Sequence, residues 1–251
     1  MIELRHGRYR ARLACGAGDI ARARALRARA FLGAGGGRDA EGADDADDHD
    51  AACLHVLVEE AARGDLVCCF RVLLLGSGAG IARSYSAQFY DLSALGRFAG
   101  RMAEMGRFCL APDRHDPDIV RLAWAAMTRL VDAHGVAMLF GCASFKGVET
   151  APYLDAFAVL GQCHLAPRRW RPRIKAPAVF RFARQLRHHE PDMKRAMRHM
   201  PPLLRSYLMM GGRVSDHAVI DRQMGTLHVF TGVEVAAIPA ARQRLLRALA
   251  G

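Results

Sequence analysis

The residues with the clearest chemical potential lie in one short stretch, Met102 to Leu110. Glu104 and Arg107 stand three positions apart there, so that a carboxylate and a guanidinium are close together in the chain. Gly106 lies between them, and a glycine inside a strand often marks a bulge, where backbone N–H groups can face a ligand. The loop 111–117 then leads into a predicted helix, whose positive end favours phosphate. This pattern suits acyl transfer from a thioester, although a surface Glu–Arg pair on an ordinary strand fits it too.

Two further charged features accompany this stretch. Arg71 interrupts the apolar run Leu66–Leu75, and it must reach either solvent or a paired anion because an unpaired buried charge is prohibitive. An acidic loop precedes that run and contains Asp39, Glu41, Asp44, Asp45, Asp47, Asp48 and Asp50. The loop is either a solvated connector or a cation-binding rim for an amino substrate. An EF-hand calcium site lacks its glycine and its closing glutamate here, and we predict no metal.

Composition limits the classes that remain. The 251 residues (27.5 kDa) suffice for one large or two small domains, and the net charge of +11 favours an acidic partner: nucleic acid, an anionic membrane or an acidic protein. The seven cysteines form no CxxC pair, which predicts reduced thiols in a cytoplasmic protein and no zinc site. No signal-peptide pattern is present and the longest apolar run is too short to span a bilayer, so that any membrane contact is expected to be peripheral, at the inner face.

The periodicity of apolar residues predicts alternating strands and helices. The expected strands are 8–15, a hairpin of 53–59 and 66–75, the stretch around Glu104, then 136–143, 213–220 and 226–235. The expected helices are 19–32 with Asp19 as N-cap, 117–134, 152–160 stopped by Gly161, 201–212 and 239–249. Together they predict an α/β (α+β) fold with a mixed, mostly antiparallel central sheet flanked by helices.

A basic segment follows the middle of the chain. Between Arg168 and Arg205 there are twelve Arg or Lys residues against Glu190 and Asp192. We predict that it is an insert at about 165–205 of a single domain, 1–251, closed by the strands and helix of 206–251. Its expected role is docking of a partner; a surface patch that only aids solubility is the alternative.

Several segments together resemble the ornithine–acyl carrier protein N-acyltransferases, a branch of the GNAT acyltransferase superfamily related to the acyl-homoserine-lactone synthases. The matching segments cover most of the chain, in the family's order. They are ALRARAFLG (25–33), DADDHD (45–50) with CLHVLVEE, CCFRVLLL, EMGRFCLAPDRHDPDIVRLAW (104–124) and MPPLLRSYLMMGGRVSDHAVIDRQMGTLHVF (200–230).

The resemblance implies a GNAT-like fold and transfer of a (3-hydroxy)acyl chain to the α-amine of L-ornithine, the first step of ornithine lipid synthesis. It places the catalytic pair on Glu104, as base, and Arg107, and backbone groups for the thioester oxyanion at Gly106 and Phe108. Substrate-binding roles fall on Arg27, Phe31, Asp47, Asp50 and Arg71, and docking of the carrier protein is expected at Arg168, Arg169, Arg171, Arg173 and Lys175.

The same resemblance concerns the donor. The GNAT pyrophosphate signature Q/RxxGxG/A is absent, since Ala111 to Pro117 contains no glycine. This departure favours no bound cofactor and a donor thioester carried on the phosphopantetheine of acyl carrier protein, whose acidity would suit the basic segment. A thiol nucleophile is not expected, because Cys109 and Cys142 have no evident histidine partner.

Two alternatives stay open. The first is an N-acyltransferase of the same fold that acts on glutamine, glycine or homoserine. The second is a nucleic-acid-binding module that uses the positive charge, although no binding motif is recognisable. Replacing Glu104 by alanine separates enzyme from binding module, because only acyl transfer needs the carboxylate.

Overall fold

The computed structural model describes residues 3–31 and 44–250. The chain divides into two compact units, each assembled from segments that are separated in the sequence. Unit 1 comprises 1–74, 105–136 and 240–251, and unit 2 comprises 75–104 and 137–239. The prediction of a single domain over 1–251 stays a prediction. The predicted helix end in the glycine run 33–37 and the acidic residues Asp39 and Glu41 lie outside the described residues.

Unit 1 is built on antiparallel strands that follow one another in space nearly as in sequence. The order is β1 (Glu3–His6), β2 (Tyr9–Leu13), β3 (Leu54–Glu60), β4 (Leu66–Leu75) and then β6 (Arg101–Leu110), whose second half belongs to this unit. The predicted hairpin is confirmed as β3–β4, with Leu54 opposite Val72 and Val58 opposite Cys68. The first strand, β1, was missed by the sequence analysis because only four residues form it.

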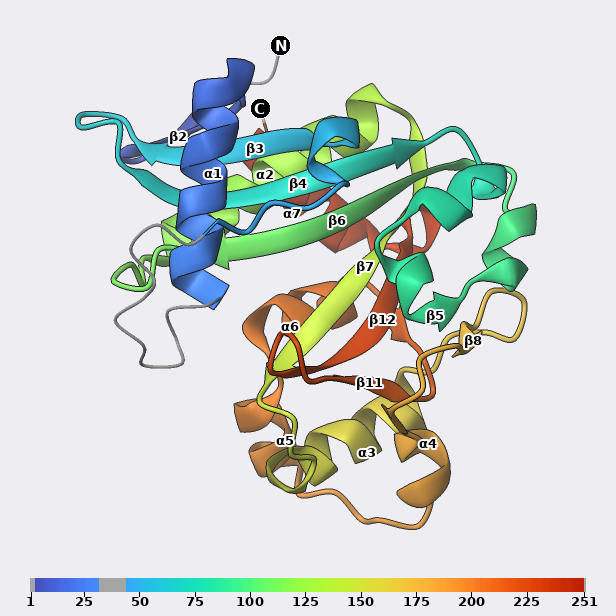
Figure 1. Cartoon of the computed structure of the whole chain (residues 1–251). Coiled ribbons are helices and arrows are strands. Elements are labelled where there is room, and N and C mark those ends of the chain that lie inside the picture. Colours follow the sequence, from blue (N-terminus) through green and yellow to red (C-terminus); the bar gives the residue numbers. More distant parts are fainter. Residues whose placement is uncertain (1–2, 32–43, 251) are drawn as a thin grey trace. The chain divides into compact units, whose positions relative to one another are not determined.

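Helices cover both faces of this sheet. Figure 1 shows α1 (Gly16–Phe31) in front of the strands and α2 (Pro117–Ala133) with α7 (Ala240–Ala250) behind them. On the α1 side, Leu26 and Ala23 pack with Leu57 of β3 and Cys69 of β4.

The predicted N-cap of the first helix is wrong. The helix begins at Gly16 rather than after Asp19, and Asp19 caps it from inside the first turn, where its carboxylate accepts a hydrogen bond from the N–H of Cys15 at 2.8 Å. The predicted second helix is confirmed, with Asp116 as N-cap.

Antiparallel strand pairs also form the framework of unit 2. β7 (Val136–Lys146) pairs with β12 (Thr226–Glu234) along nine residues, from Lys146 opposite Thr226 to Met138 opposite Glu234. β12 also pairs with β10 (Arg213–Val214) and β11 (Ala218–Asp221), and β11 pairs with β9 (Val179–Phe180). A separate pair joins β5 (Tyr90–Asp91) to β8 (Arg173–Ile174). The predicted strand 213–220 is therefore two short strands.

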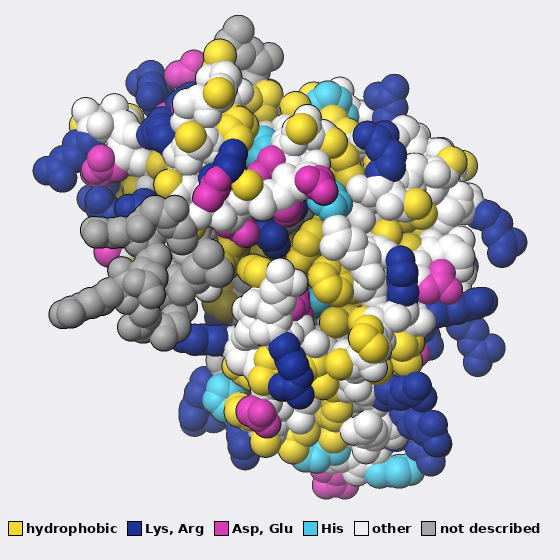
Figure 2. All heavy atoms as spheres, viewed as in Figure 1, with side chains coloured by type: hydrophobic (Ala, Val, Ile, Leu, Met, Phe, Trp, Pro, Cys, Tyr) yellow, Lys and Arg dark blue, Asp and Glu magenta, His cyan; other side chains and the backbone are white. Residues whose placement is uncertain are grey.

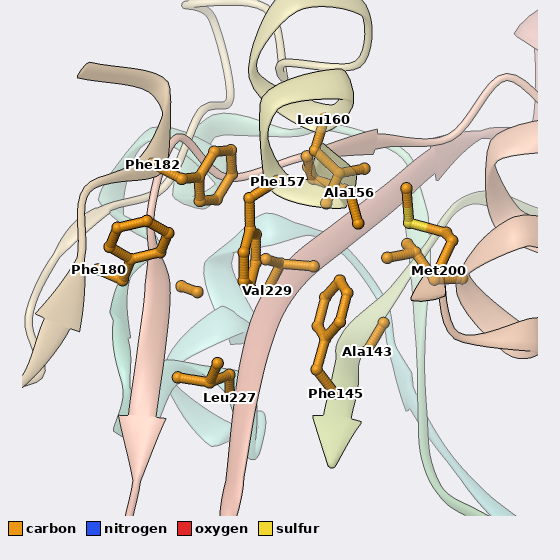
Figure 3. Packing of buried hydrophobic residues seen from close by; sticks show 13 residues of the cluster. Ala143, Phe145, Ala156, Phe157, Leu160, Phe180, Phe182, Met200, Leu227 and Val229 are labelled. Carbon is orange, nitrogen blue, oxygen red and sulfur yellow. The ribbon is translucent and has the colours of Figure 1, made fainter. Parts of the chain in front are cut away.

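Short helices bury an aromatic core in this unit. They are α3 (Leu154–Cys163), α4 (Phe182–Gln185), α5 (Met193–His199) and α6 (Pro202–Met209). Figure 3 shows Phe157 of α3 among Phe145, Phe180 and Phe182; its ring stacks on Phe182 with centroids 5.2 Å apart.

Gly161 does not stop α3, contrary to the prediction. A Cβ at this position would lie 3.2 Å from the Cα of Ala183, so the glycine allows close packing between helices instead of ending one.

The mostly antiparallel sheets with flanking helices confirm the predicted fold class. No helix in the part of the chain that the structure describes is long and apolar enough to cross a bilayer.

Candidate active site

Glu104 lies on the part of β6 that belongs to unit 2, and its carboxylate is almost fully buried, with 5% of the residue exposed. Oε1 accepts hydrogen bonds from the backbone N–H of Ser86 at 2.7 Å and from the Ser86 hydroxyl at 2.6 Å. Oε2 accepts one from the N–H of Tyr85 at 2.8 Å. Three donors of this kind favour the ionised carboxylate, which is the form that can take up a proton.

Other polar groups of unit 2 surround this carboxylate. The Ser86 hydroxyl lies 3.4 Å from the Sγ of Cys142 on β7. Tyr207 on α6 is also buried, and its pKa is raised first by burial and then by the charge of Glu104. Glu104 was predicted from the sequence but Ser86 was not, because a lone serine in an irregular segment carries no local signal.

A second cluster, in unit 1, joins residues that were predicted from the resemblance. Asp50 accepts from Nη1 and Nη2 of Arg27 on α1, at 2.7 and 3.0 Å, and from Nη1 of Arg71 on β4 at 2.7 Å. Arg27 and Arg71 are 1% and 3% exposed. Burial alone would raise the pKa of Asp50, but the two guanidiniums outweigh it and lower the pKa to about 2. Arg71 therefore meets the predicted requirement for a paired anion.

Arg107 on β6 completes this cluster. Its Nη2 donates to Asp47 at 3.2 Å, and its Nε forms an ion pair with Asp45 at 3.0 Å. Asp47 also accepts from Nη2 of Arg71 at 2.7 Å, and Asp45 accepts from Nε of Arg27 at 2.7 Å. Three aspartates thus balance three arginines, and the cluster has no surplus negative charge. Asp45 was not among the predicted site residues.

The strand geometry changes at this position. Arg107 has φ = 53°, in the left-handed region, and among the described residues no other non-glycine residue has a positive φ. β6 therefore departs from extended geometry one residue after Gly106, where the sequence predicted a bulge. The next residue, Phe108, stacks on Phe70 of β4 with ring centroids 5.7 Å apart.

The remaining predicted residues lie elsewhere. Phe31, at the end of α1, packs half-buried against the core of unit 1. In the basic segment, Arg168, Arg169, Arg173 and Lys175 are exposed, whereas Arg171 is half-buried and donates to the carbonyl of Ala166 at 2.7 Å. These basic residues are not among the hydrogen-bond partners of Glu104 described above.

The start of α2 differs from the expected phosphate-friendly helix end. The Asp116 carboxylate accepts from the N–H of Asp118 at 3.0 Å, and also from the Tyr9 hydroxyl at 3.0 Å and from Arg8 at 3.1 Å. The Asp116 carboxylate thus already occupies the N-terminal end of α2, and it would repel a phosphate there. Within the described residues, no group of His, Cys, Asp and Glu side chains is arranged to hold a metal ion.

Comparisons with known proteins place this geometry in a family. Residues 26–125 match the model of the acetyltransferase (GNAT) domain. An L-ornithine N(alpha)-acyltransferase of Rhodobacter capsulatus is 32% identical over 92% of this chain and 91% of its own length. A protein of the same name from Brucella abortus is 31% identical over 90% of this chain and 84% of its own length. The chain belongs to the L-ornithine N(alpha)-acyltransferase family.

A solved structure confirms the fold of this family member independently. FeeM, an N-acyl amino acid synthase from uncultured soil microbes, superposes with a TM-score of 0.52 over 91% of this chain and 93% of its own, at 9% identity. The predicted resemblance and the acyltransferase class are therefore confirmed, and the nucleic-acid-binding alternative loses its support.

Proposed function

We propose that this chain transfers a (3-hydroxy)acyl group from acyl carrier protein to the α-amine of L-ornithine, the first step of ornithine lipid synthesis. The observation that carries the proposal is similarity along almost the whole chain to two proteins named for that acceptor, at 31–32% identity. Similarity of this extent reaches well beyond residues 26–125, the GNAT match that contains Glu104 and the ion cluster.

The reaction needs a base, because the α-ammonium of an amino acid is no nucleophile. Glu104, directly or through a water, takes the proton; the amine nitrogen then attacks the thioester carbonyl, a C–N bond forms and the C–S bond breaks. The thiolate leaves on phosphopantetheine and takes up the second proton, which the attacking nitrogen loses as the amide forms, so that N-acylornithine and the free carrier thiol are the products. The three hydrogen bonds that hold the Glu104 carboxylate in one position support this assignment.

The negative charge that develops on the carbonyl oxygen needs donors. Backbone N–H groups at Gly106 and Phe108 are our candidates, since they flank the residue where β6 leaves extended geometry. Arg107, between them, fixes this geometry through its carboxylate partners and adds positive charge.

The balanced charge of the cluster bears on the substrate-binding roles. Asp47 and Asp50 already pair with arginines, and an ornithine ammonium would have to compete with those ion pairs. We therefore assign Arg27, Arg71, Asp47 and Asp50 to ordering the site, with Phe31 anchoring α1 beside them. A substrate carboxylate would likewise have to compete with these aspartates for the arginines.

The donor in this proposal is the carrier-protein thioester rather than coenzyme A, and no cofactor stays bound. The occupied α2 start supports this choice, because Asp116 stands where a pyrophosphate would bind. The proposed docking surface for the acidic carrier protein comprises the exposed Arg168, Arg169, Arg173 and Lys175 together with the half-buried Arg171. Figure 2 shows Lys and Arg side chains standing out over much of the visible face.

We further propose a cytoplasmic enzyme with peripheral contact at the inner membrane face, where its amphiphilic product must be delivered. On α7, Leu245 is 50% exposed and stands between exposed basic residues, Arg244 and Arg247, which suits an interfacial helix.

The test is a direct assay with the purified protein. The donors are 3-hydroxyacyl carrier protein and 3-hydroxyacyl coenzyme A, and the acceptors are ornithine, glutamine, glycine and homoserine, with products identified by mass spectrometry. We expect N-acylornithine from the carrier-protein donor. Acylation of another amino acid would move the substrate while keeping the chemistry, and no acylated amine with a folded protein would overturn the proposal.

A further inference from the structure

We propose that Ser86 is a positioning residue for the acyl transfer, and that its hydroxyl sets the pH at which Glu104 can act as the base. The inference rests on the proposed function and deepens it by naming a residue for which neither the sequence pattern nor the resemblance supplied a role. Ser86 belongs to the segment between β4 and β6, outside the sequence segments that carry the resemblance.

Ser86 reaches Glu104 in two ways. Its backbone N–H and its hydroxyl both donate to the same oxygen, Oε1, at 2.7 and 2.6 Å, and the serine is completely buried. The backbone bond would survive a change of side chain, whereas the hydroxyl bond would not. A single substitution therefore separates the two contributions.

The position of this hydroxyl is fixed by a short turn. Ser86 begins the 3₁₀ turn Ser86–Gln88, and the N–H of Phe89 donates to the Ser86 carbonyl at 3.1 Å. Ser84, two residues earlier, holds the same turn: its hydroxyl donates to the Ile81 carbonyl at 2.7 Å and accepts from the N–H of Ala87 at 3.2 Å. Ser84 is as well buried as Ser86, at 1% exposed, but these bonds run to the backbone and not to Glu104.

The direction of the bond to Cys142 follows from the bond to Glu104. A serine has one O–H, and an ionised carboxylate can only accept, so the Ser86 proton points to Oε1. The 3.4 Å contact with Cys142 must then be a bond from the thiol S–H to the Ser86 oxygen. Cys142, Ser86 and Glu104 thus form a chain in which each bond polarises the next and stabilises the carboxylate charge.

Besides Cys142 on β7, titratable groups from two other elements face this chain of hydrogen bonds: Tyr207 on α6, and Tyr90 on β5, whose pKa is raised by burial and then by the Cys142 thiol. The raised pKa of Tyr207 keeps its hydroxyl neutral across the working pH range. Removing the Ser86 hydroxyl would take away one donor to Oε1 and leave the Glu104 carboxylate less stabilised in its charged form. Its affinity for a proton would rise, and the enzyme would lose its active form at a higher pH than the wild type does.

The experiment measures kcat and kcat/KM for acyl transfer to ornithine between pH 5.5 and 9 in the wild type and in Ser86→Ala, Ser86→Thr, Cys142→Ala and Ser84→Ala. In Ser86→Ala we expect the acid limb of kcat to move upward by about one pH unit, so that the rate falls roughly 10-fold below the limb and recovers at high pH. Cys142→Ala should shift the limb in the same direction by less, and Ser86→Thr, which keeps a hydroxyl, should restore the wild-type limb.

Ser84→Ala is the matched control. It removes an equally buried hydroxyl from the same turn, so we expect a lower melting temperature but an unmoved acid limb. If Ser86→Ala does not fold, Ser86→Cys still fills the site with a weaker donor and should shift the limb upward by a smaller amount. An unmoved limb in folded Ser86→Ala or Ser86→Cys, with the wild type active, would overturn the role of Ser86 and leave the proposed function standing. A wild type that acylates no ornithine would instead overturn the proposed function.

Discussion

Replacing Asp50 by asparagine should destabilise the protein by an amount that can be worked from its surroundings. The change removes the charge, keeps the size, and leaves Arg27 and Arg71 buried with one compensating charge fewer. The pKa of Asp50 falls from its ordinary value of 3.8 to about 2 in the folded protein. At roughly 1.4 kcal/mol per unit, the ionised Asp50 stabilises the folded state by about 2 kcal/mol at pH 7. For a chain of this length, that corresponds to a fall in Tm of about 4–8 °C.

The pH dependence distinguishes this explanation from a simple packing defect. Because the folded-state pKa is lowered, the stabilisation is complete above pH of about 5, is roughly halved by pH 3, and is mostly lost by pH 2. Urea unfolding followed by circular dichroism at pH 7, 5, 4 and 3 should therefore show the gap between wild type and Asp50→Asn narrowing as the pH falls. The control is Asp113→Asn, where the side chain is 76% exposed and we expect a loss below about 0.5 kcal/mol. A gap that stays constant from pH 7 to pH 3, or one no larger than that of the control, would refute the electrostatic reasoning.

Three further predictions follow from other parts of the chain. Glu104→Gln should lower kcat by about 100-fold or more with an unchanged circular dichroism spectrum; activity above a tenth of the wild type would contradict the base assignment. Arg173→Glu should raise KM for the acyl carrier protein about 10-fold and leave KM for ornithine unchanged, while the exposed control Arg222→Glu should alter neither in steady-state assays. Gly78→Ala should destabilise unit 2 by about 3 kcal/mol or prevent its folding, since the added Cβ would lie 1.9 Å from the carbonyl oxygen of Leu95; a Tm within 2 °C of the wild type would show that the turn can shift without strain.

The elements that the sequence predicted correctly are those with a long and regular pattern. The helix from Pro117 has a proline at its start, an apolar face and Gly135 just past its end, and each signal agrees with the others. The β3–β4 hairpin joins two apolar runs through one short turn. The predictions failed where tertiary contacts decide the structure. Gly161 lies inside a helix, where its missing side chain leaves room for Ala183. Asp19 caps its helix from within the first turn because Arg12 and the N–H of Cys15 hold its carboxylate.

The residues of the candidate site also fall into those that could be predicted from the sequence and those that could not. Arg27, Asp50, Arg71 and Arg107 could be selected from the resemblance, and the structure brings them together. Ser86 could not be selected, because its contact with Glu104 joins residues 18 positions apart through a turn that has no apolar periodicity. A charge-balanced cluster was also beyond a sequence argument, since the pairing of each aspartate depends on which arginines reach it.

The backbone conformation of Arg107 links the ion cluster to the proposed oxyanion donors on β6. A non-glycine residue in the left-handed region costs about 1–2 kcal/mol, and such a residue persists only where its surroundings hold it there. Asp45 and Asp47 supply that hold, and they are themselves bound to Arg27 on α1 and to Arg71 on β4. The shape of β6 at the proposed oxyanion donors therefore depends on an acidic segment that need not touch the substrate. We therefore expect a substitution in the segment 45–50 to lower the rate by letting the strand relax toward regular geometry. The equal numbers of opposite charges in the cluster agree with such an ordering role, since direct binding of an ammonium would require a surplus of negative charge.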